Sequence, residues 1–175
     1  TLAGSSAASD VYKRQHLKLN GLHAHIGSQI FELDPHKDLG EIMVSVILDA
    51  KKYGHYIEKL NVGGGLGIKY VEDDDPPSID EWVRTISTSV LKACNKHNLD
   101  LPTLMCEPGR SIVSTGGITI YKIGAFKEVP GVRTYISVDG GMSDNPRPIT
   151  YQSNYSACLV NNPFNFKSKN KYTVA

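Results

Sequence analysis

The feature that most constrains this chain is the run Asn61-Val62-Gly63-Gly64-Gly65-Leu66-Gly67, which follows a short apolar segment at residues 57–60. Glycine has no Cβ, so it adopts positive φ and lets backbone N–H groups approach a ligand closely. Consecutive N–H groups that face one side bind anions, phosphate above all. The spacing fits neither the dinucleotide fingerprint, because Ile68 stands where a third glycine is needed, nor the nucleotide-triphosphate loop. The run therefore predicts a strand that ends in a phosphate loop or, alternatively, in a tight turn.

Two more segments have the pattern of a strand that ends in a polar loop. Residues 19–29 alternate so that His23 and His25 share one face and the intervening apolar residues share the other. Residues 104–110 form a third strand and loop, which contains Glu107. A strand with one apolar face and one histidine face suits a (β/α) barrel, whose functional groups lie at the carboxyl ends of its strands.

Two predicted helices separate these strands. The first has Asp34 as its cap and ends at Gly54, and the second begins with the capping box Ser78-x-x-Glu81 and ends near His97. The strand–helix order predicts βαβ units with a parallel sheet. The apolar residues expected on the buried helix faces are Leu39, Ile42, Met43, Val46, Ile47, Ala50, Ile79, Trp82, Val83, Ile86, Val90, Ala93 and Cys94.

The pattern changes after Gly116-Gly117. Residues 118–127 and 132–138 are strand-like and joined by a turn, and no comparable helix follows. Residues 1–15 have no periodic apolar pattern, so we interpret them as a non-native or disordered leader. The predicted organisation is a leader at 1–15, a partial barrel domain at 16–113 and a partial C-terminal β domain at 114–175, in the α/β plus β class.

The composition of the chain narrows the classes of molecule that the protein is expected to bind. Lys and Arg number 19 against 18 Asp and Glu, so no net field favours nucleic acid or an acidic membrane surface. No apolar run approaches the roughly 20 residues of a membrane span. The three cysteines, Cys94, Cys106 and Cys158, form no CxxC pair. They predict reduced thiols in the cytoplasm, whereas the balanced charge predicts a small-molecule partner.

The polar groups at the three strand ends predict a phosphorylated aromatic cofactor. Phosphate on Gly63-Gly64-Gly65 would find a hydroxyl at Ser28, the imidazole of His25 could lie against a ring, and Glu107 could contact a ring nitrogen. The alternatives are that the histidine is a structural barrel residue and that Glu107 forms an ion pair with Arg110.

Two other classes of protein stay open at this point. His23-x-His25 at a strand end could bind the metal of a barrel hydrolase, although only Glu107 offers a further ligand. The run Asp73-Asp74-Asp75 beside two prolines favours a solvated loop over a metal site. A non-catalytic phosphate-ligand binder is the other class.

Four segments together resemble the diaminopimelate decarboxylases, a family of pyridoxal-phosphate enzymes with an alanine-racemase-like barrel. The segments are residues 25–29 (HIGSQ), 63–67 (GGGLG), 107–111 (EPGRS) and 139–148 (DGGMSDNPRP). The first three also resemble ornithine and arginine decarboxylases, and the fourth favours the diaminopimelate branch. The resemblance spans about residues 16–175 and implies the last three strands of a (β/α)8 TIM-like barrel, followed by the start of a C-terminal β domain.

The resemblance implies pyridoxal 5'-phosphate as the cofactor. His25 would stack on the pyridine ring, and Glu107 would keep the pyridine nitrogen protonated, so these two are the expected catalytic residues. Ser28 and the Gly63–Gly65 backbone would hold the phosphate, with help from Gly109-Arg110.

The implied reaction is decarboxylation of meso-2,6-diaminopimelate to L-lysine and carbon dioxide, the last step of lysine biosynthesis. Arg110, Arg147 and Tyr151 would hold this substrate, whose two carboxylates suit guanidinium groups. The rival activities are decarboxylation of ornithine, arginine or another basic amino acid, and racemisation.

Two features of the resembled family are missing from this sequence. Its Schiff-base lysine lies in a Tyr-x-x-Lys-Ala-like motif, and Lys18, Lys69 and Lys122 have a different context. Its Cys-Glu-Ser-Gly-Asp segment, which enters the partner site of a homodimer, would be expected after Ala175. We therefore interpret the chain as an internal fragment that is inactive and poorly soluble by itself.

Overall fold

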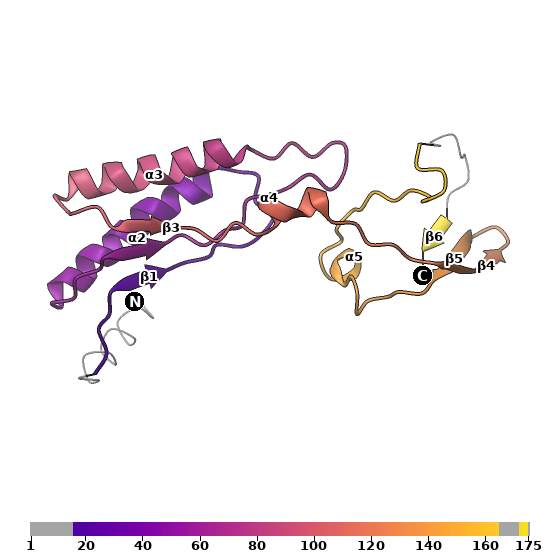
Figure 1. Ribbon diagram of the computed structural model, residues 1–175, viewed down its shortest axis with the longest axis horizontal. Helices are drawn as coiled ribbons and strands as arrows, with labels where there is room; N and C mark the ends of the chain where they lie inside the picture. Colours follow the sequence, from indigo (N-terminus) through magenta and orange to yellow (C-terminus); the bar gives the residue numbers. More distant parts are fainter. Residues whose placement is uncertain (1–15, 165–171, 175) are drawn as a thin grey trace. The chain divides into compact units, whose positions relative to one another are not determined.

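The structure is a computed structural model that describes residues 16–164 and 172–174. The predicted leader at residues 1–15 lies outside the described residues. The chain divides into two compact units (Figure 1). The first contains the described residues up to Ile68 together with Asp75–Thr115, and the second contains Lys69–Asp74 together with the described residues from Gly116 onward. The sequence pattern gave no sign that Lys69–Asp74 packs with the later residues.

The first unit is built on a parallel sheet of three short strands in the order β1-β2-β3. The strands are β1 (Gly21–His23), β2 (Lys59–Asn61) and β3 (Thr103–Met105). Their register aligns Leu22 with Leu60 and Leu60 with Leu104. The predicted parallel order of βαβ units is confirmed, and all three strands end at the same edge of the sheet.

Helices α2 (Asp34–Lys52) and α3 (Ile79–Lys96) connect these strands. The predicted capping box of α3 is confirmed, because Ser78 Oγ accepts from Glu81 N at 3.2 Å and Glu81 Oε2 accepts from Ser78 N at 2.9 Å. The predicted cap of α2 is wrong. Leu33 caps that helix in αR geometry without a side-chain hydrogen bond, which leaves Asp34 in the first turn, where its charge still favours the helix dipole.

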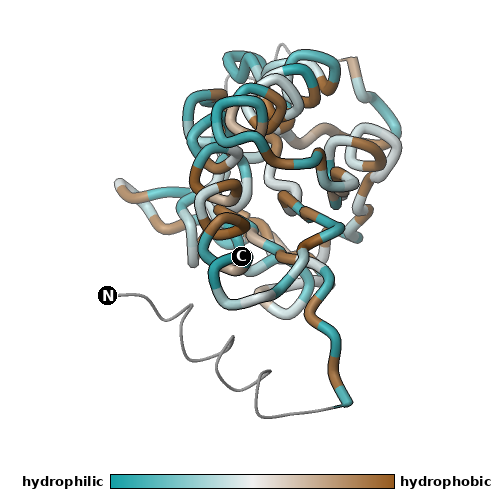
Figure 2. Tube along the Cα trace, turned by 90° about the vertical axis from the view of Figure 1, so that its left-hand side faces the viewer, coloured by the Kyte–Doolittle hydropathy of each residue, from teal (hydrophilic) through white to brown (hydrophobic). Residues whose placement is uncertain are grey.

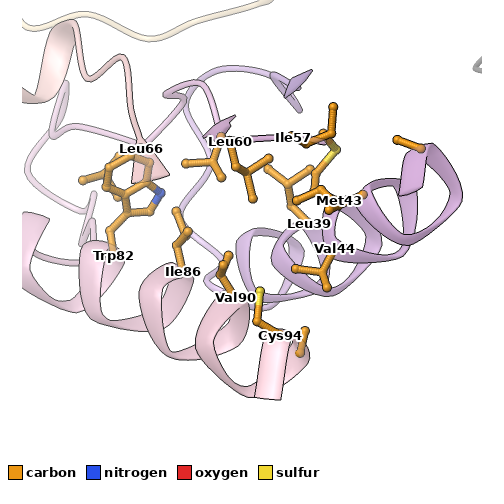
Figure 3. Packing of buried hydrophobic residues seen from close by; sticks show 14 residues of the cluster. Leu39, Met43, Val44, Ile57, Leu60, Leu66, Trp82, Ile86, Val90 and Cys94 are labelled. Carbon is orange, nitrogen blue, oxygen red and sulfur yellow. The ribbon is translucent and has the colours of Figure 1, made fainter. Parts of the chain in front are cut away.

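Both helices pack on one face of the sheet through a single apolar cluster (Figure 3). Leu60 from β2 and Val44 from α2 are fully buried, and Trp82 from α3 is 1% exposed. Hydrophilic and hydrophobic colours alternate along helical turns in Figure 2, as expected of amphipathic helices. The buried side chains come from α2, from β2 and the segments on either side of it, and from α3, so packing between the three holds the strand ends in place.

The buried face of α2 differs from the predicted one. Ile42 is 57% exposed, whereas Val44 and His36 are fully buried. The physical reason is the close approach of α3 at Gly40, where a Cβ would lie 2.6 Å from Ser89 Oγ. This contact centres the buried stripe on Gly40 and turns Ile42 outward. On α3 the outermost predicted positions, Ile79 and Val83, are each 44% exposed because they flank the stripe.

The second unit contains a three-stranded sheet in the order β4-β5-β6. The hairpin of β4 (Ile123–Val129) and β5 (Arg133–Val138) turns near Gly131, whose φ is +73°, and β6 (Tyr172–Val174) pairs in parallel with β5. The first strand starts at Ile123 rather than at residue 118 as predicted. Within the described part of this unit, no residue is buried.

Three short helical segments complete the described elements. They are α4 (Arg110–Val113), the 3-10 turn η1 (Ser114–Gly116) and α5 (Arg147–Thr150). The last of these lies where the sequence predicted the end of a long loop. Across the residues that the structure describes, no helix combines the length and the apolar character that crossing a membrane requires.

Candidate cofactor site

The glycine loop directly follows β2 and is in contact with the two neighbouring strand ends. Gly63 has a φ of +68°, and a Cβ there would lie 2.7 Å from the carbonyl oxygen of Ala24. A Cβ on Gly64 would collide with the carbonyl oxygen of Glu107, and one on Gly65 (φ +98°) with the carbonyl oxygen of Gly27. The absence of side chains therefore allows three loops to pack backbone to backbone, a reason that the sequence pattern alone did not reveal.

The backbone N–H groups of the glycine loop fall into two pairs. Within the described part of the chain, the backbone N–H groups of Gly65 and Leu66 have no hydrogen-bond partner. Gly63 N–H instead donates to Asn61 Oδ1 at 2.9 Å, and Gly64 N–H donates to His25 Nδ1 at 3.3 Å. One N–H of the loop is thus held locally by Asn61 and one by His25 after β1, while two donate to no described residue.

His25 lies against the glycine loop at the end of β1. Its Cα and Cβ are each 3.0 Å from the position that a Gly63 Cβ would occupy. Because Nδ1 accepts the hydrogen bond from Gly64, the neutral imidazole carries its proton on Nε2. The side chain is exposed and held from one side, so it can present the ring to a ligand.

The loop that carries Ser28 is fastened to the glycine loop by Gln29. Gln29 Nε2 donates to the carbonyl of Ile68 at 2.5 Å, and Ile68 N–H donates to Gln29 Oε1 at 3.3 Å. Arg110 Nη1 also donates to Gln29 Oε1, at 3.4 Å. Ser28 is exposed beside this contact, and Gly109 is the residue before α4.

Glu107 follows β3 and has a distinct neighbour for each carboxylate oxygen. Oε1 accepts from Asn61 Nδ2 at 2.7 Å, and Oε2 lies 3.5 Å from His23 Nε2. The backbone N–H of Glu107 donates to the carbonyl of Gly63 at 2.7 Å. The three strand ends are therefore joined by direct contacts among His25, the glycine loop and Glu107.

Arg147 and Tyr151 belong to the second unit and are described within it. Arg147 Nη1 donates to the hydroxyl of Tyr70 at 3.0 Å, and Tyr151, just after α5, is 73% exposed. Tyr70 is itself held, since its carbonyl accepts from Ser156 Oγ at 3.1 Å and its ring lies 5.1 Å from that of Tyr155. The segment after the glycine loop thus reaches the predicted substrate arginine.

The described residues offer no metal centre, because they contain no group of three or more His, Cys, Asp or Glu side chains that could hold an ion. Asp74 Oδ2 accepts from the backbone N–H groups of Tyr70 and Val71 at 2.9 and 3.1 Å, so it closes a turn. His23 contacts Glu107. The hydrolase alternative therefore receives no support from these residues.

Sequence reasoning missed three residues, namely Asn61 and Gln29 at the strand ends of the first unit and Tyr70 in the second unit. Asn61 had a usable signal, because it alternates with the buried Leu60 and Val62 and so belongs to the polar face that also carries His23. The partners of Gln29 and Tyr70 are distant in sequence and depend on how the loops pack, so no local pattern reveals them.

This parallel βαβαβ unit brings a glycine loop, an imidazole and a carboxylate to the carboxyl ends of its strands, the edge at which α/β proteins bind ligands. The family described as "Pyridoxal-dependent decarboxylase, pyridoxal binding domain" matches residues 2–114. The chain belongs to this family of pyridoxal-dependent decarboxylases. The match begins inside the segment that we interpreted as a leader, and that interpretation stays a prediction.

Individual relatives of the chain carry a more specific name than the family does. The chain is 60% identical over 141 residues to a diaminopimelate decarboxylase of Synechocystis sp., a match that covers 81% of this chain and 30% of the relative. It is 42% identical over 156 residues to one of Bacillus subtilis, covering 89% and 36%. The crystal structure of a diaminopimelate decarboxylase from M. jannaschii with L-lysine is similar with a TM-score of 0.74 and 32% identity, covering 87% and 34%. The chain spans about one third of the length of these relatives.

Proposed function

We propose that the protein carrying this chain converts meso-2,6-diaminopimelate to L-lysine and carbon dioxide with pyridoxal 5'-phosphate, as the last step of lysine biosynthesis. The observation that carries the proposal is the direct contact of His25, the glycine loop and Glu107 in a chain with 60% identity to such a decarboxylase. The three strands would be the last three of a (β/α)8 barrel, followed by a C-terminal β domain. A homodimer with shared active sites and a cytoplasmic location complete the proposal.

The residues at the strand ends fit the cofactor. The unused N–H groups of Gly65 and Leu66 suit a phosphate, and the bare backbone at Gly63 and Gly64 leaves no side chain in its way. Ser28 and the Gly109-Arg110 segment would add a hydroxyl and a cation. When bound, pyridoxal phosphate supplies a protonated ring that withdraws electrons from the carbon that loses carbon dioxide.

Two side chains of this chain act on that ring in the proposal. Glu107 would hold the proton at the pyridine nitrogen, because an ionised carboxylate stabilises a neighbouring cation. His25 would cover one face of the ring, since its hydrogen bond from Gly64 N–H fixes the imidazole from the side of the loop. Both residues bind and orient; neither needs to move for this role.

Substrate recognition would depend on Arg110, Arg147 and Tyr151. Diaminopimelate has a second carboxylate at its far end, and a guanidinium group binds carboxylates through paired N–H donors. Ornithine has a cation there and would require acids instead. The hydrogen bond from Arg147 to Tyr70 limits the orientations of the guanidinium group, which favours a defined carboxylate position.

The test is Glu107→Gln in the full-length protein. We expect the variant to bind cofactor but to lose at least about 100-fold in turnover, because a neutral amide does not keep the ring nitrogen protonated. The control is Glu41→Gln, on the exposed face of α2, which should behave like the original protein. Near-normal turnover of Glu107→Gln would contradict the role of this carboxylate.

Substrate choice is tested separately by measuring carbon dioxide release from diaminopimelate, ornithine and arginine side by side. Preference for ornithine or arginine would replace the proposed reaction with the related one. If the protein only binds the cofactor, borohydride reduction will trap no modified lysine, and the non-catalytic alternative will hold.

A further inference from the structure

The side chain of Asn61 connects the glycine loop to the carboxylate of Glu107. Its Oδ1 accepts from Gly63 N–H at 2.9 Å, and its Nδ2 donates to Glu107 Oε1 at 2.7 Å. A backbone N–H can only donate and an ionised carboxylate can only accept, so these two neighbours fix which end of the amide is which. Asn61 therefore has one orientation that satisfies both contacts.

The main chain around this connection is already held. Glu107 N–H donates to the carbonyl of Gly63 at 2.7 Å, and Gly64 packs so closely that a Cβ would collide with the Glu107 carbonyl oxygen. What the backbone does not fix is the rotation of the Glu107 side chain, which is 54% exposed. An exposed glutamate side chain loses rotamer entropy when it is ordered, so a contact has to select one orientation.

We propose that Asn61 is a positioning residue for Glu107. By holding Oε1, its amide leaves Oε2 for the ring nitrogen of the cofactor, with His23 Nε2 at 3.5 Å as the other neighbour of that oxygen. A neutral donor suits this task, because it orders the carboxylate without adding a charge that competes for the same proton. The inference rests on the proposed cofactor, but it does not depend on which amino acid is the substrate.

Asn61→Asp separates this role from a merely structural one. The new carboxylate still accepts from Gly63 N–H, so the loop keeps its internal bond, but at high pH it has no hydrogen to donate to Glu107 and repels it. At low pH a shared proton restores a donor between the two carboxyl groups. Acid should therefore restore the affinity of Asn61→Asp for the cofactor. Asn61→Ala, which removes both hydrogen bonds, should bind the cofactor more weakly at every pH.

Other titratable groups lie near Asn61, so each variant is compared with the original protein at the same pH. His23 and His25 lie at the end of β1, and Cys106 and Arg110 lie on the segment that carries Glu107. All four remain in every variant, so each value is divided by that of the original protein at the same pH. Asn20→Asp, the same substitution at the exposed position just before β1, controls for the added charge.

The experiment measures the dissociation constant of pyridoxal phosphate from the absorbance of the bound cofactor, in the full-length protein at pH 6 and pH 8. For Asn61→Asp we expect affinity to fall about tenfold at pH 8 and to return to within about twofold of the original at pH 6, the effect of losing and regaining one hydrogen bond to a charged group. The affinity of Asn61→Ala for pyridoxal phosphate should be about tenfold lower at both pH 6 and pH 8. Asn20→Asp should bind pyridoxal phosphate as tightly as the original protein does at both pH values.

Equal affinity of Asn61→Asp and the original protein at both values would overturn the inference. An equal loss of affinity in Asn61→Asp at pH 6 and pH 8 would also overturn it, because it would mean that Asn61 only supports the loop. Failure of the proposed function has a different signature, because the original protein would then bind the cofactor without releasing carbon dioxide from diaminopimelate. An original protein that does not bind pyridoxal phosphate would overturn both.

Discussion

Gly63→Ala tests the reason for the glycine run most directly. The glycines were predicted to allow a ligand to approach, but the structure adds a close contact between backbones. At Gly63 two costs coincide, namely a φ of +68° and a Cβ that would lie 2.7 Å from the Ala24 carbonyl oxygen. Substitutions at three other glycines allow the cost of positive φ and the cost of the collision to be measured separately. Gly54 has a φ of +81° in open space, Gly64 has only the collision, and Gly116 has neither.

The expected changes in the free energy of unfolding follow from these two terms. Alanine at positive φ costs about 1–2 kcal/mol, which is the whole penalty at Gly54. Forcing an extra methyl group into a packed contact costs about 1–3 kcal/mol, which applies at Gly64. Gly63→Ala should combine them and destabilise the protein by about 2–5 kcal/mol. Gly116→Ala should be neutral or stabilise by up to about 1 kcal/mol, because it restricts the unfolded chain.

Urea unfolding of the four variants of the full-length protein measures these differences, provided that the slope of the transition is unchanged. The expected order of destabilisation is Gly63→Ala first, Gly64→Ala and Gly54→Ala between, and Gly116→Ala last. If Gly63→Ala costs no more than Gly54→Ala, the contact with Ala24 does not constrain the loop, and our account of the glycine run is wrong.

Three further predictions concern other parts of the chain. Burial, with a smaller contribution from the charge of His25, lowers the pKa of His36 below its usual 6.5, so the unfolded state binds the proton more readily. The free energy of unfolding should therefore fall as pH drops below about 6.5, and His36→Phe should weaken this dependence in unfolding curves measured from pH 5 to pH 8. Ser78→Ala removes the cap of α3 and should cost about 1 kcal/mol in urea unfolding. Tyr70→Phe removes the acceptor of Arg147 and should raise the KM for diaminopimelate by about 3–10-fold with little change in kcat; a fall in kcat alone would contradict this.

The helices were predictable because their signals are local. The Ser78–Glu81 capping box fixed the start of α3, and three-four spacing gave most of its buried face. The miss at Ile42 has a non-local cause, because Gly40 admits α3 and rotates the buried stripe. The same holds for the start of α2, where the geometry of Leu33 replaces the expected cap.

The candidate site was predictable in its components but not in its connections. His25, the glycines and Glu107 each follow a strand, and parallel strands bring their ends to one edge. The hydrogen bonds that join them pass through Asn61 and Gln29, whose roles depend on strand register and loop contacts. Side chains with partners about 40 positions away leave no periodic trace in a sequence.

The assignment of Lys69–Asp74 to the second unit has a practical consequence for anyone who subclones this protein. The polypeptide passes between the two units at Ile68, returns at Asp75 and leaves again after Thr115. A single cut near position 115 would therefore not separate two modules, because the N-terminal piece would keep Tyr70 and lose Arg147, Tyr155 and Ser156, the side chains that hold it. Excising the first unit cleanly would require replacing the short excursion with a linker, and insertions placed within it would disturb both halves at once.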